Sequence, residues 1–266
     1  MTLLFVGKGN ANVCYLLSSE VYRISLRYQK LSRNNAYVRE NFQFIDSKIR
    51  SLPMLADVVV SMRLEEVFVD KEWTNVLKDE NILIDDSHMQ CIVMPLLHAK
   101  DSTCEQLDHF NQIYRCSLND VVTWEFKPKW LYQSSDYCRN CTHNSLKGRD
   151  IEYCFLHDPE LIIETLFEGR QLPEEFLDDI LQYLQSSDSI TQRLYAAQRF
   201  VKDDLSTLMT LRDVTCFLTW SRNTRSVKAT IIDVDQKPAN KLRHWQSTES
   251  ALASFPGRKK AHFNHE

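Results

Sequence analysis

The order in which helix-type and strand-type patterns follow one another limits the folds open to this chain. Residues 3–7 and 13–17 are short apolar runs around a turn rich in glycine and asparagine, and EVYRIS (20–25) follows as a third strand. Helical patterns come later, and 214–234 alternates as a β-hairpin before a helix predicted over Lys237–Ala253. This order of elements predicts a two-lobed α+β architecture: strands come first, helices follow, and a hairpin and a helix come last.

The other elements follow from periodicity and from the positions of prolines. A helix is predicted over Asn34–Ile49, a fully apolar strand over Cys91–Leu97, and another strand over 121–130. Pro173 suits the first turn of the helix after it, and 191–209 is predicted to be helical in part.

The segment 97–108 is predicted to separate two lobes: a small β-rich N-terminal lobe, residues 1–100, and a larger α+β lobe, residues 101–266.

Composition excludes several classes of protein. The net charge of −4 argues against general binding of polyanions such as nucleic acids, so that any anion site has to be local. No run of 18 apolar residues predicts a membrane helix, and the first residues lack the features of a secretory signal. The eight cysteines then favour intracellular thiols over disulfides.

The segment from Trp124 to Lys147 concentrates basic residues. Lys127 and Lys129 lie on either side of Pro128, so on an extended backbone both ammonium groups would leave one face. Further along, a helix would align three more groups on one face, namely Arg139, His143 and Lys147. The two rows predict an anion pocket, and the alternative is a solvated basic surface. The aromatic frame of Trp124, Phe126 and Trp130 favours the pocket.

Two features of the N-terminal strands point to phosphate. The turn between the first two strands would let backbone amides approach a phosphate, and it consists of Gly7, Lys8, Gly9, Asn10, Ala11 and Asn12. A hairpin turn also needs such residues for steric reasons alone. Arg23 in the third strand either contacts an anionic partner or is an edge-strand charge that faces water.

Carboxylates follow the hairpin near the C-terminus. Asp233 and Asp235 stand at the end of an apolar strand, where a pair spaced i, i+2 shares one face and suits Mg²⁺. The alternative is an acidic pair at a helix N-terminus. Two lysines and a tryptophan follow at the spacing of one helix face: Lys237, Lys241 and Trp245.

Lys202 and the adjacent acids Asp203 and Asp204 supply a second carboxylate pair. A catalytic base for an alcohol needs such a group, and a helix N-cap is the alternative role.

Cysteine spacing raises the possibility of zinc. Cys138 and Cys141 form a C-x₂-C pair, and Cys154 with His157 forms a C-x₂-H pair. The competing interpretation is that the cysteines are small buried packing residues.

Taken together, the ordered motifs GKGNANV, VYRIS, EFKPKW, CRNCTHNSLK, KDDLS and IIDVDQKP resemble the inositol-pentakisphosphate 2-kinase family. The matches are colinear from Gly7 to about Trp245. The resemblance implies a kinase-like, two-lobed fold that uses ATP and Mg²⁺ to phosphorylate the 2-hydroxyl of inositol 1,3,4,5,6-pentakisphosphate, which yields inositol hexakisphosphate (phytate).

Carried onto this chain, the resemblance implies a role for each motif. The Gly7–Asn12 turn and Arg23 would contact ATP phosphates, and Asp233 would hold Mg²⁺. Asp204, or its neighbour Asp203, would act as the base. Lys127 would lie nearest the transferred phosphoryl group. The inositol phosphates would be bound by Lys127, Lys129, Arg139, His143, Lys147, Lys237, Lys241 and Trp245.

Two other functions remain open on the residues alone. The same cations would serve a non-catalytic inositol polyphosphate-binding module, and the cysteine set would serve a zinc-stabilised interaction module. With the kinase, we expect small-molecule partners, neither nucleic acid nor membrane, a monomer, and a nuclear or cytoplasmic location.

Overall fold

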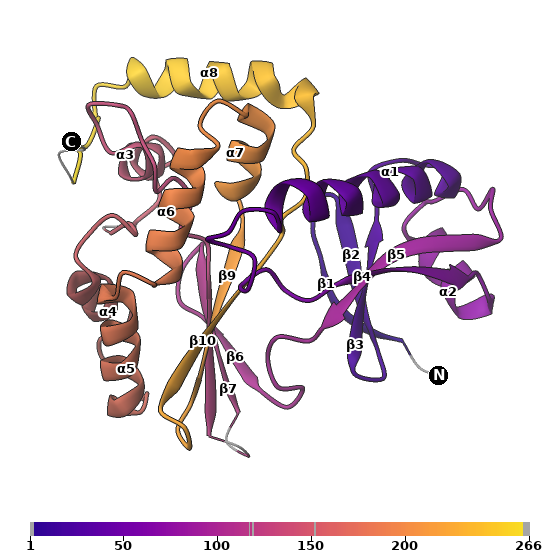
Figure 1. Ribbon diagram of the computed structural model, residues 1–266, viewed down its shortest axis with the longest axis horizontal. Helices are drawn as coiled ribbons and strands as arrows, with labels where there is room; N and C mark the ends of the chain where they lie inside the picture. The colour runs from indigo at the N-terminus through magenta and orange to yellow at the C-terminus, as the bar shows by residue number, and fades with distance from the viewer. Residues whose placement is uncertain (1–2, 117, 119, 152, 263–266) are drawn as a thin grey trace. The chain divides into compact units, whose positions relative to one another are not determined.

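The structure is a computed structural model that describes residues 3–116, 118, 120–151 and 153–262. The described chain is α+β, as predicted, with two five-stranded antiparallel sheets and several helices (Figure 1). It divides into two compact units. The first unit comprises Met1–Ser51 and Val59–Lys100, and the second comprises Leu52–Val58 and Asp101–Glu266.

The sheet of the first unit has the order β1-β2-β3-β5-β4. Its strands are β1 (Leu4–Lys8), β2 (Asn12–Leu17), β3 (Glu20–Ser25), β4 (Arg63–Phe68) and β5 (His88–Pro95). The predicted strand–turn–strand start is confirmed, because β1 and β2 pair as an antiparallel hairpin. The apolar strand predicted at Cys91–Leu97 is confirmed as β5, which begins three residues earlier.

Helices cover this sheet on both faces. Helix α1 (Leu31–Phe44) continues as a π-helix, η1 (Ile45–Ile49), and α2 is Lys71–Asp79. Residues 89–94 of β5 are all buried, since α1 packs on the strand and Trp73 of α2 joins Met89 and Val93 in one apolar core. The predicted helix over 34–49 is confirmed, with a start at Leu31.

The sheet of the second unit has the order β10-β9-β8-β7-β6. Its strands are β6 (Thr103–Gln106), β7 (Asn111–Cys116), β8 (Val121–Phe126), β9 (Thr215–Ser221) and β10 (Ser226–Ile232). The predicted C-terminal hairpin is confirmed as β9 and β10. The strand predicted over 121–130 ends at Phe126, before the Lys-Pro-Lys sequence.

Helices of the second unit lie in two groups (Figure 1). Near one end of the sheet gather α3 (Arg139–Leu146), α6 (Ile190–Phe200), α7 (Leu205–Leu211) and α8 (Leu242–Ala253). The second group is α4 (Pro159–Phe167) and α5 (Glu174–Gln185), which pack on each other, and α5 contacts β10. Pro173 is the N-cap of α5, which confirms the predicted helix start.

Aromatic residues fill the core of the second unit. The Trp124 and Phe126 rings, fully buried, pack 4.4 Å apart between centroids, and Phe155 stacks on Phe126 at 4.6 Å. The expected aromatic frame of an anion pocket is therefore wrong for Trp124 and Phe126, which belong to the core. Each described helix is too short or too polar to cross a bilayer.

Candidate active site

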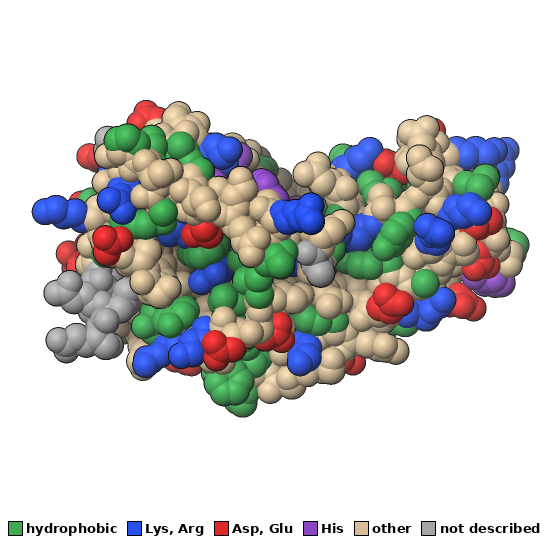
Figure 2. Space-filling view, turned by 90° about the horizontal axis from the view of Figure 1, so that it is seen from above, with side chains coloured by type: hydrophobic (Ala, Val, Ile, Leu, Met, Phe, Trp, Pro, Cys, Tyr) green, Lys and Arg blue, Asp and Glu red, His purple; other side chains and the backbone are tan. Residues whose placement is uncertain are grey.

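The second unit contains a cavity of about 430 Å³ with a strongly cationic lining. The lysines and arginines of this cationic cavity are Lys127, Lys129, Arg139, Lys147, Arg149, Arg212, Lys237 and Lys241. Among the described lining residues, Asp213 is the one carboxylate. Figure 2 shows acidic and basic side chains interspersed over one face of the molecule. The positive charge is thus concentrated in this cavity, as we expect for a chain with a negative net charge that binds an anion.

One wall of the cavity is the loop after β8. The Lys127 amide donates to the Phe110 carbonyl at 3.1 Å, which ends the strand. Lys129 has φ of +64°, in the left-handed region that side chains other than glycine rarely adopt. The extended backbone predicted for this segment is therefore wrong at Lys129, yet both lysines line the cavity.

A buried glutamine on α6 holds this loop in place. Gln198 Oε1 accepts hydrogen bonds from the backbone amides of Leu131 and Tyr132, both at 3.0 Å. Its Nε2 donates to the carbonyls of Lys129 at 3.0 Å and Leu211 at 3.2 Å. One side chain therefore satisfies four backbone groups and offsets the strain at Lys129.

Trp130 forms the centre of a three-layer stack in the cavity lining. The guanidinium carbons of Arg139 and Arg212 lie 3.4 and 3.5 Å from the Trp130 ring centroid. Each contact of this kind stabilises by about 0.5–2 kcal/mol, depending on desolvation. Glu249 of α8 accepts from Arg139 Nε at 2.8 Å. Burial and the nearby Arg139 lower the pKa of Arg212, whose guanidinium nevertheless stays charged at neutral pH.

Asp213 joins two of the lysines. It accepts from Lys129 Nζ at 2.7 Å and from Lys237 Nζ at 2.6 Å. Burial alone would raise the pKa of Asp213, but the two ammonium groups outweigh it and lower that pKa well below its usual range. The carboxylate thereby holds two cations from separate segments at one place, ready for an anion.

Helix α3 forms the second wall, and its predicted basic face is confirmed. Arg139, His143 and Lys147 all line the cavity, with the spacing i, i+4, i+8. Burial, followed by the charges of Arg139 and Arg149, lowers the pKa of His143 to about 4. His143 is therefore neutral at pH 7 and offers one N–H donor rather than a charge.

The chain before and within α8 completes the lining. Lys237, Lys241 and Trp245 all line the cavity, although the helix predicted from Lys237 starts later: a 3₁₀ turn covers Ala239–Lys241 and α8 begins at Leu242. His244, one position off the predicted face, lines the cavity as well.

The two acids after β10 occupy different environments. Asp233 has φ of +60°, its Oδ2 accepts from Thr215 Oγ1 at 2.7 Å, and Lys127 Nζ lies 3.4 Å away. Asp235 is buried, and its carbonyl accepts from Thr210. Since β10 ends at Ile232, the pair does not share one strand face as the sequence had predicted.

Asp204 is the N-cap of α7. Its two carboxylate oxygens accept from the backbone amide of Thr207 at 3.1 Å and from the Thr207 hydroxyl at 2.8 Å. Asp203, the alternative base, is exposed beside it. The helix-cap role that the sequence offered as an alternative is thus present for Asp204.

The first unit contains the predicted phosphate-binding turn and Arg23. Gly9 N donates to Asn12 O at 2.9 Å and closes the turn, and space for a ligand remains, since no atom lies within 4 Å of the missing Cβ of Gly7 or Gly9. Lys8 forms an ion pair with Glu80 at 2.6 Å. Arg23 is buried on β3 inside the sheet, so the alternative of an edge charge facing water is wrong.

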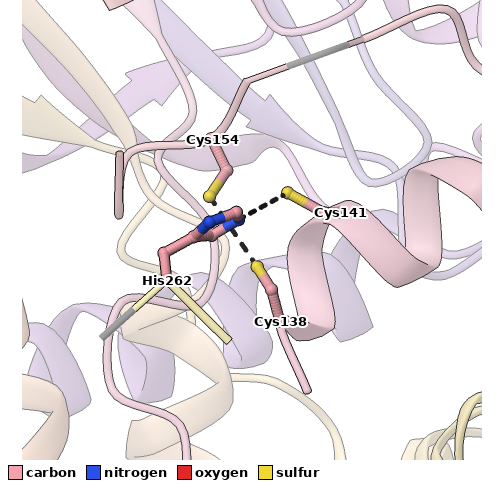
Figure 3. A group of neighbouring side chains, drawn as sticks. All are labelled: Cys138, Cys141, Cys154 and His262. Atoms are coloured by element: carbon pink, nitrogen blue, oxygen red, sulfur yellow. Dashed lines mark hydrogen bonds between the residues drawn. The ribbon is translucent and has the colours of Figure 1, made fainter. Parts of the chain in front are cut away.

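The three cysteines of the predicted metal site come together. The Sγ atoms of Cys138, Cys141 and Cys154 and a ring nitrogen of His262 all lie within 4.8 Å of one another (Figure 3). His157, the fourth ligand expected from the spacing, is instead beside His262, with 2.9 Å between His157 Nε2 and His262 Nδ1.

Several residues of these sites escaped prediction. Arg212, Asp213 and Gln198 carry no motif, and Arg149 lies just beyond the basic helix face. His262 is more than 100 residues from the cysteines in sequence. A search for a fourth ligand among the eight histidines of the chain would have included it, but spacing alone would not single it out.

Comparison with known proteins identifies relatives of this chain. The model of a family described as inositol-pentakisphosphate 2-kinase matches residues 201–251. A Kluyveromyces lactis protein named inositol-pentakisphosphate 2-kinase is 95% identical over 266 residues, which is 100% of each chain. Proteins of the same name from Eremothecium gossypii and Saccharomyces cerevisiae are each 34% identical, over 94% of this chain and 96% and 95% of theirs.

Proposed function

Because the chain belongs to the inositol-pentakisphosphate 2-kinase family, we propose that the cationic cavity of the second unit binds its inositol phosphate substrate. The enzyme transfers the γ-phosphoryl group of ATP to the 2-hydroxyl of inositol 1,3,4,5,6-pentakisphosphate and so produces inositol hexakisphosphate.

The charge of the cavity is the observation that carries this proposal. Five phosphates at about −1.5 to −2 each give the substrate a charge of roughly −8 to −10. Eight lysine and arginine side chains against one carboxylate in about 430 Å³ match a small, densely charged anion. Each phosphate missing from a poorer substrate would leave cations unpaired, which makes the same cavity selective.

The rigid parts of the cavity suit recognition of fixed phosphate positions. Arg139 and Arg212 are held against Trp130, and Asp213 holds Lys129 and Lys237. Cations held before binding lose less conformational entropy when the substrate arrives. His143 supplies a neutral donor, and a neighbouring phosphate would favour its protonated form.

Lys127 and Asp233 are proposed to act where the phosphoryl group is transferred. Their side chains are 3.4 Å apart, and Thr215 orients the Asp233 carboxylate. Mg²⁺ commonly binds proteins through one or two carboxylates together with substrate phosphates, and the half-exposed Asp233 fits that role. The ion would neutralise charge on the phosphates, while Lys127 stabilises the charge that develops on the transferred group. A role of buried Asp235 beside the ion stays a prediction.

The glycine turn Gly7–Asn12 and Arg23 are proposed to bind the nucleotide. Backbone amides in an open turn can approach a phosphate closely, and Arg23 supplies a charge within the same sheet. Their part in ATP binding rests on the resemblance and on this local geometry.

We propose Asp203 as the base that orients the 2-hydroxyl, in preference to Asp204. Both oxygens of Asp204 accept hydrogen bonds at the start of α7, so that carboxylate already has a structural task. Asp203 is exposed in the preceding turn.

One assay tests the function as a whole. The protein is incubated with Mg-ATP and a panel of inositol phosphates, and the position of the added phosphate is determined by NMR. We expect turnover of inositol 1,3,4,5,6-pentakisphosphate with phosphate at the 2-position. Binding of the panel without any turnover would leave a non-catalytic binding protein and refute the kinase.

Paired variants test the base. Asparagine is as good an N-cap as aspartate, so both Asp203→Asn and Asp204→Asn should fold. We expect Asp203→Asn to lower kcat by about 10²–10⁴-fold, the usual contribution of a general base, and Asp204→Asn to lower it less than about tenfold. The opposite ranking would assign the base to Asp204.

A further inference from the structure

The two arginines on either side of Trp130 differ in their acidic partners. Glu249 Oε1 accepts from Arg139 Nε at 2.8 Å and from Arg139 Nη2 at 2.7 Å. Within the described part of the chain, no carboxylate forms an ion pair with Arg212. The stack therefore holds two positive charges and one negative charge, and the uncompensated charge belongs to Arg212.

The hydrogen bonds of the Arg212 side chain are incomplete as well. A guanidinium carries five N–H donors and no acceptor. Arg212 Nη2 donates to the Tyr132 carbonyl at 3.1 Å, whereas Nη1 reaches only the Met209 sulfur, a weak acceptor, at 3.9 Å. Arg212 Nε is buried and has no hydrogen-bond partner among the described residues. A cation that is 9% exposed thus has one oxygen acceptor.

Such an environment is unfavourable for a charged group. Burying a charge is costly unless the charge is paired and hydrogen-bonded. Burial and repulsion by Arg139 lower the pKa of Arg212, as expected for a cation with too little compensation. Because Arg212 lines the cavity, an anion that enters there can supply the missing partner.

A purely structural role is the alternative for Arg212. The side chain stacks on Trp130 at 3.5 Å and fixes the Tyr132 carbonyl, so it helps to hold the loop wall. These contacts explain the position of the side chain, but they do not require a charge without an acidic partner. The unpaired charge therefore points to a ligand.

The backbone around Arg212 is held before any ligand arrives. Arg212 is the C-cap of α7, and its amide donates to the Leu208 carbonyl at 3.0 Å. Gln198 Nε2 donates to the carbonyl of Leu211 at 3.2 Å, and the carboxylate of Asp213 accepts from two lysines. A cation fixed in this way loses little conformational entropy when an anion binds.

We propose that Arg212 is a specificity-determining residue, whose guanidinium donates to one phosphate of the inositol pentakisphosphate and makes that phosphate the most strongly required for binding. The inference rests on the proposed function of the cavity. A ligand that lacks a phosphate beside Arg139 leaves this arginine paired with Glu249. A ligand that lacks the phosphate beside Arg212 leaves a buried cation unpaired, which costs more. Discrimination should therefore be uneven around the inositol ring.

Binding measurements with incomplete ligands test the contact. Five inositol tetrakisphosphates each lack one phosphate of inositol 1,3,4,5,6-pentakisphosphate, and calorimetry without ATP gives Kd for all six ligands. We expect Arg212→Gln to weaken binding of the pentakisphosphate by about 10–100-fold, the range for a hydrogen bond between charged groups. The same substitution should change Kd less than about threefold for one tetrakisphosphate, the ligand without the phosphate that Arg212 binds, and should weaken the other four as it weakens the pentakisphosphate.

Two further variants serve as controls. Arg212→Lys keeps the charge but loses the planar donor fork, so it should show the same pattern with a smaller loss than Arg212→Gln. Arg222 is an exposed arginine of the same unit outside the cavity lining, and Arg222→Gln should leave every Kd within about twofold of the parent value.

Equal weakening of all six ligands by Arg212→Gln would mean that Arg212 only supports the loop wall, and it would overturn the proposal. An Arg212→Gln protein with the parent Kd for the pentakisphosphate would overturn it too. If neither Arg212 variant folds, the unaltered protein decides: one tetrakisphosphate should bind at least about tenfold more weakly than each of the other four, and five similar Kd values would refute the inference.

Failure of the kinase itself gives a different result. A parent protein that shows the expected Kd pattern but does not phosphorylate the pentakisphosphate would refute the proposed reaction and leave Arg212 as a binding residue. A kinase that is active in the parent and shows no ligand-dependent effect of Arg212→Gln would refute this inference alone.

Discussion

The two walls of the cationic cavity are constructed in different ways. The helix wall, formed by Arg139, His143 and Lys147 of α3, follows from local spacing, because residues four apart share one face of any helix. The loop wall, residues 127–130, has a left-handed residue at Lys129 and depends on partners 66 to 84 residues away. The helix itself therefore sets the spacing of the first wall, whereas the backbone of the second wall should be sensitive to changes in distant residues.

The largest effect is expected when the partner of the loop wall is removed. Gln198→Leu keeps the side chain's approximate volume but leaves four backbone groups without their partner. Unsatisfied buried groups cost about 1–3 kcal/mol each and are not additive, so we expect the free energy of unfolding to fall by about 2–4 kcal/mol. Urea denaturation measures it.

The control for this variant lies on the same helix. Gln192 is exposed, and Gln192→Leu should change the free energy of unfolding by less than about 0.5 kcal/mol. Equal effects of the two substitutions would mean that Gln198 does not stabilise the loop wall.

A smaller effect is expected at the contact between the two walls. Trp130→Leu removes the ring that separates Arg139 from Arg212. Two guanidinium groups then repel each other without the intervening ring, so we expect KM for the inositol phosphate to rise roughly 10–30-fold, or about 1.4–2 kcal/mol, with a smaller change in kcat. Steady-state kinetics across a range of substrate concentrations would show it.

Phe200 offers the matching control, because it is an exposed aromatic residue outside the cavity lining. Phe200→Leu should leave both kinetic parameters within about twofold. A Trp130→Leu enzyme with the parent KM would show that the stack does not organise the walls.

At neutral pH the smallest effect is expected at the helix wall, because the contribution of His143 to stability changes only as the pH falls. His143 has a pKa of about 4 in the folded protein against about 6.5 when unfolded, so between these values the unfolded chain binds more protons. The free energy of unfolding should therefore fall as pH decreases from 6.5 to 4, and His143→Gln should reduce that slope. Denaturation midpoints at several pH values measure the difference.

Bound substrate should reverse the direction of the pKa shift of His143. A neighbouring phosphate raises the pKa, so binding takes up a proton and is strengthened as pH falls through the pKa of the bound state. The ratio of KM values for His143→Gln and the parent should rise as pH falls from 8 to 6, since only the parent gains this charge. A ratio that is independent of pH would mean that His143 stays neutral beside the substrate.

Motifs with short-range spacing could be recognised before the fold was known. The α3 face, the C-x₂-C pair and the Lys237, Lys241 and Trp245 series depend on distances along one segment, and the structure brings each set together. The hairpin of β9 and β10 and the start of α5 at Pro173 follow in the same way from alternation and proline geometry.

Other assignments could not be made locally. Trp124 and Trp130 look alike in an aromatic segment, but one lies in the core and the other between two arginines. Whether such a tryptophan lies in the core or in the cavity lining depends on where β8 ends. The end of β8 follows from its pairing with β7 and β9. Similarly, the sequence around Arg212 and Asp213 contains no motif that predicts an anion site.

The α+β class, the basic helix face, the family and the three thiols could all be recognised from the amino-acid sequence, because each depends on periodicity or on ordered motifs within short segments. The folded structure was needed to show that Gln198, Arg212 and Asp213 complete the loop wall and that His262 lies beside the thiols. These contacts join residues that are far apart in the sequence. The spacing of residues within one segment does not show which distant segment will pack against it.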